Sequence, residues 1–286
     1  MTSHLFSFGH GYSAQALARL LLPQGWHITG TTRSPDKAGY LAETGITPLI
    51  WPGGALDTLG DTTHVLISAG PDADGDPVLA AALEPLARVA PRLRWLGYLS
   101  TTGVYGDHQG GWVDETTPLT PSTRRGQARA LAETQWQDFA RETGAPLHIF
   151  RLAGIYGPGR GPFAKVRNGT AKRIIKPGQV FSRIHVADIA QVLEASINRP
   201  VPGAIYNLCD NDPAPPEDVI AYAATLLGMP VPSAIPIDEA DMTPMARSFY
   251  AESKRVRNDR VKDELGVKLI YPDYKSGLRA LLAQER

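Results

Sequence analysis

The sequence lacks the features that commit a chain to an oxidising compartment, a membrane or a polyanion. Its 286 residues include a single cysteine, Cys209, so no internal disulfide can form and a reducing cytoplasm is expected. Lys+Arg and Asp+Glu are equal in number, 29 of each, which leaves no surplus charge for nucleic acid or an acidic membrane. No apolar run approaches the roughly 20 residues of a membrane span, and the opening residues do not resemble a signal peptide. The expected partner is therefore a small molecule.

Several catalytic motifs are also missing. The seven histidines are scattered, no second cysteine exists, and no H-E-x-x-H motif occurs, so no metal site is predicted. The P-loop and the G-x-S-x-G turn of serine hydrolases are absent as well.

Short apolar segments alternate with helix-like segments through the first half of the chain. This alternation is typical of strands joined by helices, and it predicts an α/β fold with a doubly wound parallel sheet. The predicted strands are 4–8, 26–31, 47–50, 64–68, 95–100 and 147–151, and the predicted helices lie near 13–24, 35–43, 77–90 and 122–143. In the less regular second half we expect a strand pair near 173–184, a helix at 186–198, a strand at 204–208, and helices near 214–227 and 252–265.

The first predicted strand runs into the turn Gly9-His10-Gly11-Tyr12-Ser13-Ala14, which opens a helix. In this G-x-G-x-x-A spacing the first glycine makes the tight turn, the second lets the backbone approach a pyrophosphate, and the small last residue lets helix and strand pack closely. The helix N-terminus adds amide donors and a positive dipole. The segment therefore predicts a dinucleotide-binding Rossmann sheet; the alternative is a glycine-rich turn of another α/β fold.

The end of the second strand bears on the choice of dinucleotide. In NAD-type sites an acidic residue about 20 positions after the glycines holds the ribose 2′-hydroxyl. Here Thr32 and Arg33 occupy that place, and a guanidinium suits a 2′-phosphate. NADP is therefore favoured over NAD, the alternative being that Arg33 is a solvated loop arginine.

Five segments carry a family resemblance. Residues 100–106, STTGVYG, resemble the S-[ST]-x-x-V-Y-G segment of extended short-chain dehydrogenases/reductases, the NAD(P)-dependent epimerase/dehydratase family. The segments WVDE at 112–115, RLAGIYGPG at 151–159, HVAD at 185–188 and YN at 206–207 follow in the order typical of that family. Together they span most of the chain.

The resemblance implies a bound nicotinamide cofactor and two structural parts. These are a Rossmann domain at 1–160 and 183–206 and a smaller C-terminal α/β substrate lobe at 161–182 and 207–286. Thr101 matches the catalytic Ser/Thr that hydrogen-bonds the reacting oxygen. A homodimer formed through two long helices is common in the family. The resemblance also places the cofactor against Ser68, Ala69 and Gly70 and against Ala153, Gly154 and Ile155.

The chain departs from the family at its acid/base pair. The family has Y-x-x-x-K on the long helix, whereas here Arg125 stands for the tyrosine and Arg129 for the lysine. Arginine stays protonated above pH 12, so it cannot exchange a proton during turnover, but it can polarise a carbonyl or grip an anion. A literal Y-x-x-x-K far downstream, Tyr250 to Lys254, is set aside as a chance match.

Other residues could carry the proton or contact the substrate. Tyr105, at the end of the strand that holds Thr101, is the first candidate, and its alternative role is structural. His108 and His185 come next, although His185 could instead pack where the two parts of the chain meet. Arg160 and Lys165 are candidate anion contacts near the substrate. The basic run 254–260 is interpreted as a solvated helix face, or as a grip on an anionic substrate.

Three functions follow from these patterns. The first is an NADP-dependent oxidoreductase, or epimerase/dehydratase-like enzyme, with an altered active site, acting on a small, anionic or sugar-like substrate. The second is a non-catalytic NADP-binding sensor or partner-binding protein. The third is a structural homologue without cofactor, which would leave the intact G-x-G-x-x-A turn unexplained.

Overall fold

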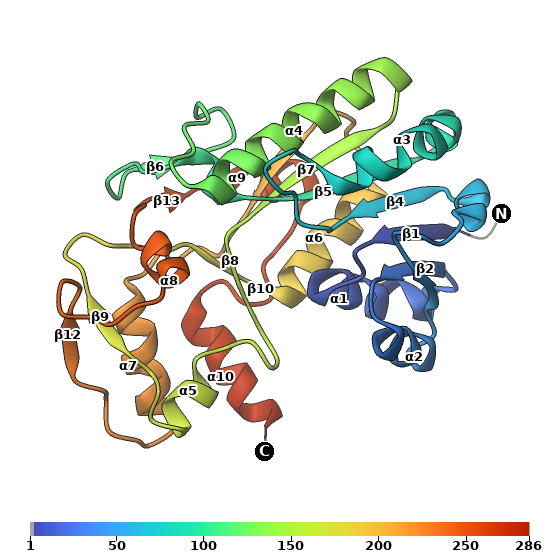
Figure 1. Ribbon diagram of the computed structural model, residues 1–286. Coiled ribbons are helices and arrows are strands. Elements are labelled where there is room, and N and C mark those ends of the chain that lie inside the picture. The colour runs from blue at the N-terminus through green and yellow to red at the C-terminus, as the bar shows by residue number, and fades with distance from the viewer. Residues whose placement is uncertain (1–2, 286) are drawn as a thin grey trace.

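The computed structural model describes residues 3–285 and is built on a parallel seven-stranded sheet (Figure 1). The strand order is β11-β7-β5-β4-β1-β2-β3, in which the chain order reverses between β1 and β4. The doubly wound parallel sheet is therefore confirmed, and each predicted strand lies within one residue of an observed one. The strands are β1 (His4–Phe8), β2 (His27–Thr32), β3 (Thr47–Ile50), β4 (His64–Ile67), β5 (Trp95–Thr101), β7 (Leu147–Leu152) and β11 (Ile205–Leu208).

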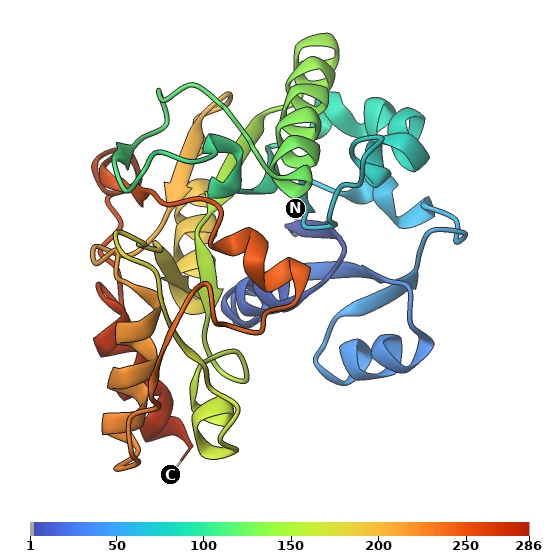
Figure 2. The ribbon, with the colours of Figure 1, turned by 60° about the vertical axis from the view of Figure 1, so that its left-hand side comes forward.

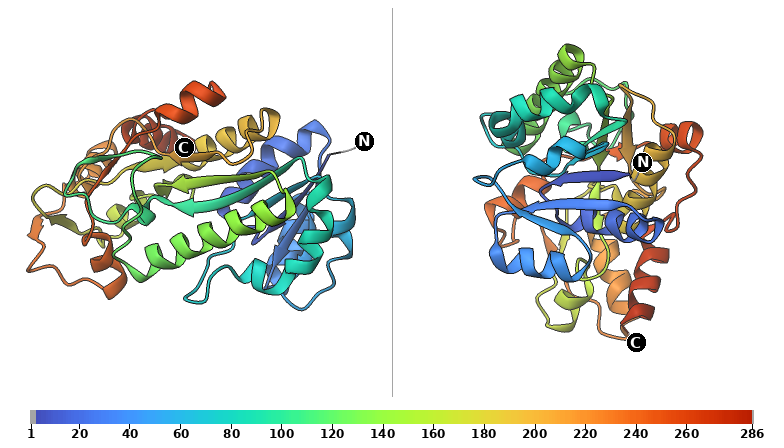
Figure 3. Two further views of the ribbon diagram at one scale, coloured as in Figure 1. Left: turned by 90° about the horizontal axis from the view of Figure 1, so that it is seen from above. Right: turned by 90° about the vertical axis from the view of Figure 1, so that its right-hand side faces the viewer.

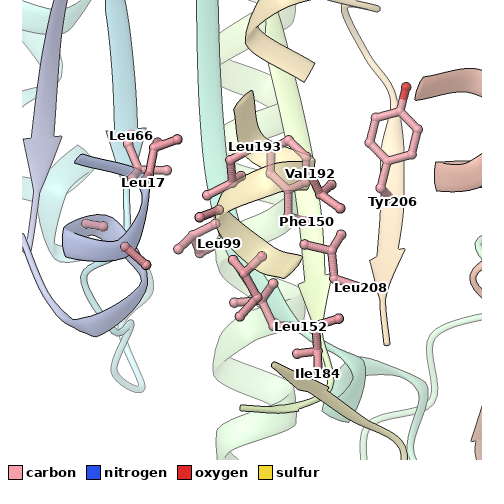
Figure 4. Close-up of a cluster of buried hydrophobic side chains, with 14 of the residues drawn as sticks. Leu17, Leu66, Leu99, Phe150, Leu152, Ile184, Val192, Leu193, Tyr206 and Leu208 are labelled. Atoms are coloured by element: carbon pink, nitrogen blue, oxygen red, sulfur yellow. The ribbon is translucent and has the colours of Figure 1, made fainter. Parts of the chain in front are cut away.

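Helices cover both faces of this sheet (Figure 3). Because alternate residues of a strand face opposite sides, Leu5 and Leu66 pack with α1 and α6, while Phe6 and Val65 pack with α3 and α4. Figure 4 shows the first of these two layers, with Leu17 of α1 and Leu193 of α6 against the strands. The covering helices are α1 (Tyr12–Leu21), α2 (Pro35–Glu43), α3 (Pro77–Val89), α4 (Arg124–Thr143) and α6 (Val186–Asn198).

The remaining elements gather beside the carboxyl ends of the strands. Three helices, α5 (Phe163–Arg167), α7 (Pro216–Leu226) and α10 (Tyr274–Gln284), share a core of their own. The segment that precedes α10 is anchored to α6, because the Asp188 carboxylate accepts hydrogen bonds from the backbone N–H groups of Ile270 (2.6 Å) and Tyr271 (3.1 Å). The other elements are β6 (Trp112–Val113), β8 (Gly154–Tyr156), β9 (Arg173–Ile175), β10 (Arg183–His185), β12 (Ala234–Pro236), α8 (Pro244–Phe249), β13 (Arg255–Val256), α9 (Asp259–Leu265), and the 3-10 helices Leu22–Gln24, Asp57–Asp61, Ala90–Arg92 and Thr102–Tyr105.

Two predictions for the second half are wrong. The strands near 173–184 do not pair with each other, because β9 pairs with β12 and β10 with β8. The helix predicted at 252–265 begins only at Asp259, and Arg255 and Val256 form a strand against β6. The basic run is therefore no solvated helix face: distant contacts override local helix propensity, with Lys254 donating to the Gly106 carbonyl and Arg255 to that of Gly110.

Two further points concern the organisation of the chain. Strand β11 is part of the main sheet and runs to Leu208, two residues past the predicted domain boundary. The division of the chain at 161–182 and 207–286 otherwise stays a prediction. Within residues 3–285, no helix combines the length and apolar character needed to cross a membrane.

Candidate functional site

The turn between β1 and α1 has the geometry that its glycine spacing predicts. Gly9 adopts φ +71°, and a Cβ there would lie 2.9 Å from the backbone nitrogen of Ala69. The Gly9 N–H donates to Thr31 Oγ1 (2.7 Å), and Ser68 Oγ donates to the Gly9 carbonyl (2.5 Å). Gly11 occupies the N-cap position of α1, where no side chain caps the helix. The first amides of α1 thus remain available to an anion.

The His10 side chain packs inward from the turn, against β2. Its side chain is fully buried, and neither ring nitrogen has a hydrogen-bond partner among the described residues. The ring lies against Gly30 of β2, where an added Cβ would approach His10 Cγ to 2.7 Å. Burial lowers the pKa of His10 to about 4, so the ring is neutral at pH 7. Any contact of His10 with a cofactor would therefore come from its backbone.

A cleft of about 770 Å³ opens beside this turn at the carboxyl ends of the strands. Residues of the sheet, of α4 and of the C-terminal elements line it, among them Phe249 of α8. Figure 2 shows α8, the orange-red helix near the middle of the view, between the C-terminal elements and the sheet. Twelve of the predicted site residues line it: Gly11, Tyr12, Ser13, Ser68, Gly70, Thr101, Arg125, Arg129, Ala153, Gly154, Ile155 and Arg160. Outside the lining lie Gly9, His10, Ala14 and Ala69 in or against the turn, and Thr32 and Arg33 at the end of β2.

Thr101 and the two arginines of α4 meet in this cleft. Thr101 ends β5, and its hydroxyl oxygen accepts the Gly103 N–H (3.2 Å). Arg129 is tied to the same strand, because its guanidinium donates to the Leu99 carbonyl and lies 5.8 Å from the ring of Tyr98. Arg125 is more exposed and lies 5.4 Å from the ring of Phe249 in α8. Two permanent cations of α4 therefore line the same cleft as the Thr101 hydroxyl.

Tyr105 does not reach the cleft, contrary to its candidacy as a proton carrier. Its side chain is fully buried and its hydroxyl donates to Asn207 Oδ1 (2.8 Å) while accepting from Arg151 Nη1 (2.9 Å). Arg151 in turn forms a buried ion pair with Glu133 of α4 (2.7 Å). Burial raises the pKa of Tyr105 to about 12, which makes proton exchange near pH 7 unfavourable. Tyr105 ends the 3-10 helix Thr102–Tyr105 rather than β5, and its hydroxyl ties that helix to β7 and β11.

Three other candidates also lie away from the cleft. His185 is buried and caps α6, where Nδ1 accepts the Ala187 N–H (3.2 Å), and its ring packs between Tyr156 and Tyr271. Burial lowers the pKa of His185 to about 4. Lys165 is exposed on α5, and His108 Nε2 lies 3.1 Å from the Tyr105 carbonyl; neither lines the cleft.

The sequence interpretation missed the contribution of segment 248–256 to the cleft. Phe249, Glu252 and Lys254 line it, together with Arg183 at the start of β10. The literal Y-x-x-x-K at 250–254, set aside as a chance match, lies in this segment, and its lysine reaches the cleft. Its tyrosine does not: Tyr250 packs against Phe181, with ring centroids 5.6 Å apart.

Comparisons with known proteins agree with this architecture. The model of the NAD dependent epimerase/dehydratase family matches residues 80–209. Protein YeeZ of Escherichia coli (strain K12) is 30% identical over 281 residues, which cover 93% of this chain and 95% of that protein. Among solved structures, a functionally unknown conserved protein from Silicibacter pomeroyi is 61% identical with a TM-score of 0.93, and 100% of each chain is covered.

A more distant structure shares the fold. The dTDP-glucose 4,6-dehydratase from Bacillus anthracis, solved in complex with NAD, is 17% identical with a TM-score of 0.79 over 100% of this chain and 98% of that one. Together with the turn, the sheet order and the cleft, these likenesses place the chain: it belongs to the NAD(P)-dependent epimerase/dehydratase family of extended short-chain dehydrogenases/reductases, as an atypical member with arginines in place of the tyrosine–lysine pair.

Proposed function

We propose that the protein is an NADP-dependent oxidoreductase or epimerase/dehydratase-like enzyme acting on a small, anionic or sugar-like substrate. One observation carries the proposal: the uncapped amides of α1 open onto the same cleft as Thr101 and the cations of α4. An anion-binding helix end and a substrate-orienting hydroxyl in one cavity suit a dinucleotide and a substrate bound side by side.

The residues of the turn fit the diphosphate of a dinucleotide. The N–H groups of Gly11, Tyr12 and Ser13 would hold it, while the backbone of Ala153 to Ile155 would border the nicotinamide. Because Gly9 has no side chain, the backbone of the turn can pack directly against Ala69 while a ligand is bound. When bound, the cofactor supplies hydride transfer. The chain's part is to orient the substrate oxygen through Thr101 and to stabilise negative charge through Arg125 and Arg129.

The Gly9→Ala variant is expected to bind NADPH at least about tenfold more weakly, because the new methyl group pushes the turn away from Ala69. Gly25→Ala is the matched control. Gly25 also has a positive φ (+80°), but nothing lies within 4 Å of an added Cβ. Both variants should lose about 1–2 kcal/mol for the left-handed backbone, but only Gly9→Ala should lose affinity in a fluorescence titration. Equal NADPH affinity in the two variants would contradict this role of the turn.

The preference for NADP rests on Arg33. Its side chain is exposed, and no hydrogen bond or ion pair to the rest of the described chain engages it. Ser34, the next residue, caps α2, and its hydroxyl oxygen accepts the Lys37 N–H (3.3 Å). The guanidinium is therefore free to meet a 2′-phosphate beside a second helix N-terminus.

The Arg33→Ala variant should lose most of its preference for NADPH over NADH. A hydrogen bond to a charged group contributes about 1.5–3 kcal/mol, so NADPH affinity should fall about 10- to 100-fold while NADH affinity stays constant. Arg92→Ala, an exposed arginine of the 3-10 helix that precedes β5, is the control. Isothermal titration with both nucleotides measures the effect; an equal loss for both, or none, would assign Arg33 no role in selecting NADP.

The charge of the cleft favours an anionic substrate. Among residues 3–285, five cationic side chains line it but only one carboxylate does: the cations are Arg125, Arg129, Arg160, Arg183 and Lys254, and the carboxylate is Glu252. The guanidinium groups of Arg125 and Arg160 have no acidic partner among the described ion pairs, and they lie over the rings of Phe249 and Tyr12. A guanidinium group without an acidic partner suits a carboxylate or phosphate, which it can bind through two parallel hydrogen bonds.

A non-catalytic NADP sensor is the second candidate, favoured by the replacement of both members of the acid/base pair by arginine. NADPH oxidation at 340 nm across a panel of carboxylated and phosphorylated aldehydes and ketones separates the two functions. An enzyme oxidises NADPH with at least one of them, whereas a sensor binds NADPH and oxidises none.

A further inference from the structure

Glu252 and Lys254 form an ion pair inside the cleft. The Glu252 Oε2–Lys254 Nζ distance is 2.7 Å, and the two side chains are only 10% and 11% exposed. Glu252 Oε1 also accepts the hydroxyl of Ser122 (2.7 Å), which directly precedes the N-cap of α4, while Lys254 Nζ donates to the Gly106 carbonyl (2.7 Å). The pair thus lies between the start of α4 and the loop that follows the Thr101 strand.

The segment that carries the pair is anchored on both sides. The Ser253 N–H donates to Asp107 (2.8 Å), and the Ser253 carbonyl accepts the backbone N–H groups of His108 and Gly110. On the other side Gln179 donates to the Glu252 carbonyl (2.6 Å), and Lys176 donates to the Tyr250 carbonyl. Such a backbone can hold a side chain at a fixed place in the cleft without a helix.

The tyrosines and arginines that line the cleft in the described part of the chain are poorly suited to exchange a proton near pH 7. Tyr12 donates to the Pro158 carbonyl (2.9 Å), and burial raises its pKa. Burial also raises the pKa values of Tyr156 and Tyr274. The arginines remain protonated at any working pH. Among the described lining residues, Glu252 is the one carboxylate.

We propose that Glu252 is the group that exchanges a proton with the substrate, in place of the family's tyrosine, and that Lys254 holds its carboxylate in position. The inference rests on the proposed function, since it concerns the reaction in that same cleft. In the oxidative direction the substrate's O–H bond breaks and the Glu252 carboxylate receives that proton. The carbon that bears this oxygen gives up its hydrogen as hydride to NADP⁺, and the C–O bond becomes C=O. In reduction each transfer reverses, and Glu252 exchanges its proton with solvent past the exposed Ser122 hydroxyl.

A crystal structure of the wild-type protein with NADP⁺ tests the geometry without needing a substrate. A base must lie within hydrogen-bond reach of the reacting oxygen, directly or through one water. With the substrate carbon about 3–3.5 Å from nicotinamide C4 and the reacting oxygen bonded to that carbon, a Glu252 oxygen is expected within about 6–9 Å of nicotinamide C4. A carboxylate farther away, or turned out of the cleft, would overturn the inference while leaving the cofactor site intact. Failure of NADP⁺ to bind would instead overturn the proposed function, and this inference with it.

Glu252→Gln tests the chemistry in solution. With any carbonyl compound that the wild-type protein reduces, kcat should fall about 10²- to 10⁴-fold, while the NADPH dissociation constant stays within about twofold. Glu142→Gln, on the exposed side of α4, is the matched control and should change neither quantity. Unchanged turnover in Glu252→Gln would refute the role. If the wild-type protein binds NADPH but reduces none of the panel compounds, the enzymatic function fails, and this inference fails with it.

Discussion

Arg151→Met should lower the free energy of unfolding by about 3–5 kcal/mol, as expected when one partner of a buried ion pair is removed. Both side chains of the Arg151–Glu133 pair are nearly inaccessible, at 4% and 3% exposed. Glu133 would then keep only the hydroxyl of Ser100 (2.5 Å), and Tyr105 would lose the donor to its own hydroxyl. The pair joins β5, α4 and β7 directly beside the cleft, so its loss should also weaken NADPH binding.

Urea unfolding measures this loss, and Arg141→Met is its control. The Arg141–Asp138 pair lies on the same helix, but its side chains are 72% and 48% exposed. Exposed pairs contribute about 0–1 kcal/mol, so the control should lose no more than that. The double variant Arg151→Met/Glu133→Leu removes both charges and should recover part of the loss. A loss below about 1 kcal/mol in Arg151→Met would show that the pair does not stabilise the fold.

Acidification from pH 7 to pH 5 should destabilise the protein by about 3 kcal/mol. Burial lowers the pKa values of four histidines from 6.5 to about 4: His10, His64, His148 and His185. The unfolded chain therefore takes up protons below pH 6.5 that the folded chain does not, and stability falls as the pH falls from 6.5 toward 4. Burial raises the pKa of Asp188 to about 6 and of Asp210 to about 8, which opposes this trend but does not cancel it.

His148→Gln isolates one histidine. His148 is fully buried, and its Nε2 accepts the Val201 N–H (2.9 Å), which a glutamine oxygen can also do. The loss of stability between pH 7 and pH 5 should be about 2 kcal/mol smaller in the variant than in the wild-type protein. Urea unfolding at the two pH values measures it. An identical pH dependence in both proteins would mean that His148 titrates in the fold as it does in the unfolded chain.

The sheet and the cofactor turn were predictable because their signals are local. A strand such as 147–152 is buried on both faces and apolar at four of its six positions. The turn at 9–14 requires glycine at a positive φ and at a close approach, and the sequence has glycine at both places.

Sequence reasoning placed Thr101 and the two arginines of α4 in the cleft, but it failed for candidates whose positions depend on distant contacts. Nothing near Tyr105 reveals that Asn207, 102 residues away, accepts its hydroxyl proton and holds it in the core. Histidine is a common catalytic residue, but His185 serves as the N-cap of α6. Glu252 and Lys254 enter the cleft only because the segment that carries them is held against residues 106–110 and 178–180, which no local pattern encodes.

Titration of the purified protein with NADPH and NADH is the most direct test of the central claim, that the amide-lined end of α1 holds an NADP-type dinucleotide. Isothermal titration calorimetry, with the quenching of tryptophan fluorescence as a second readout, should show one site per chain and NADPH bound at least about tenfold more tightly than NADH. No heat of binding and no quenching with either nucleotide would contradict the account of the turn, the cleft and the reaction together.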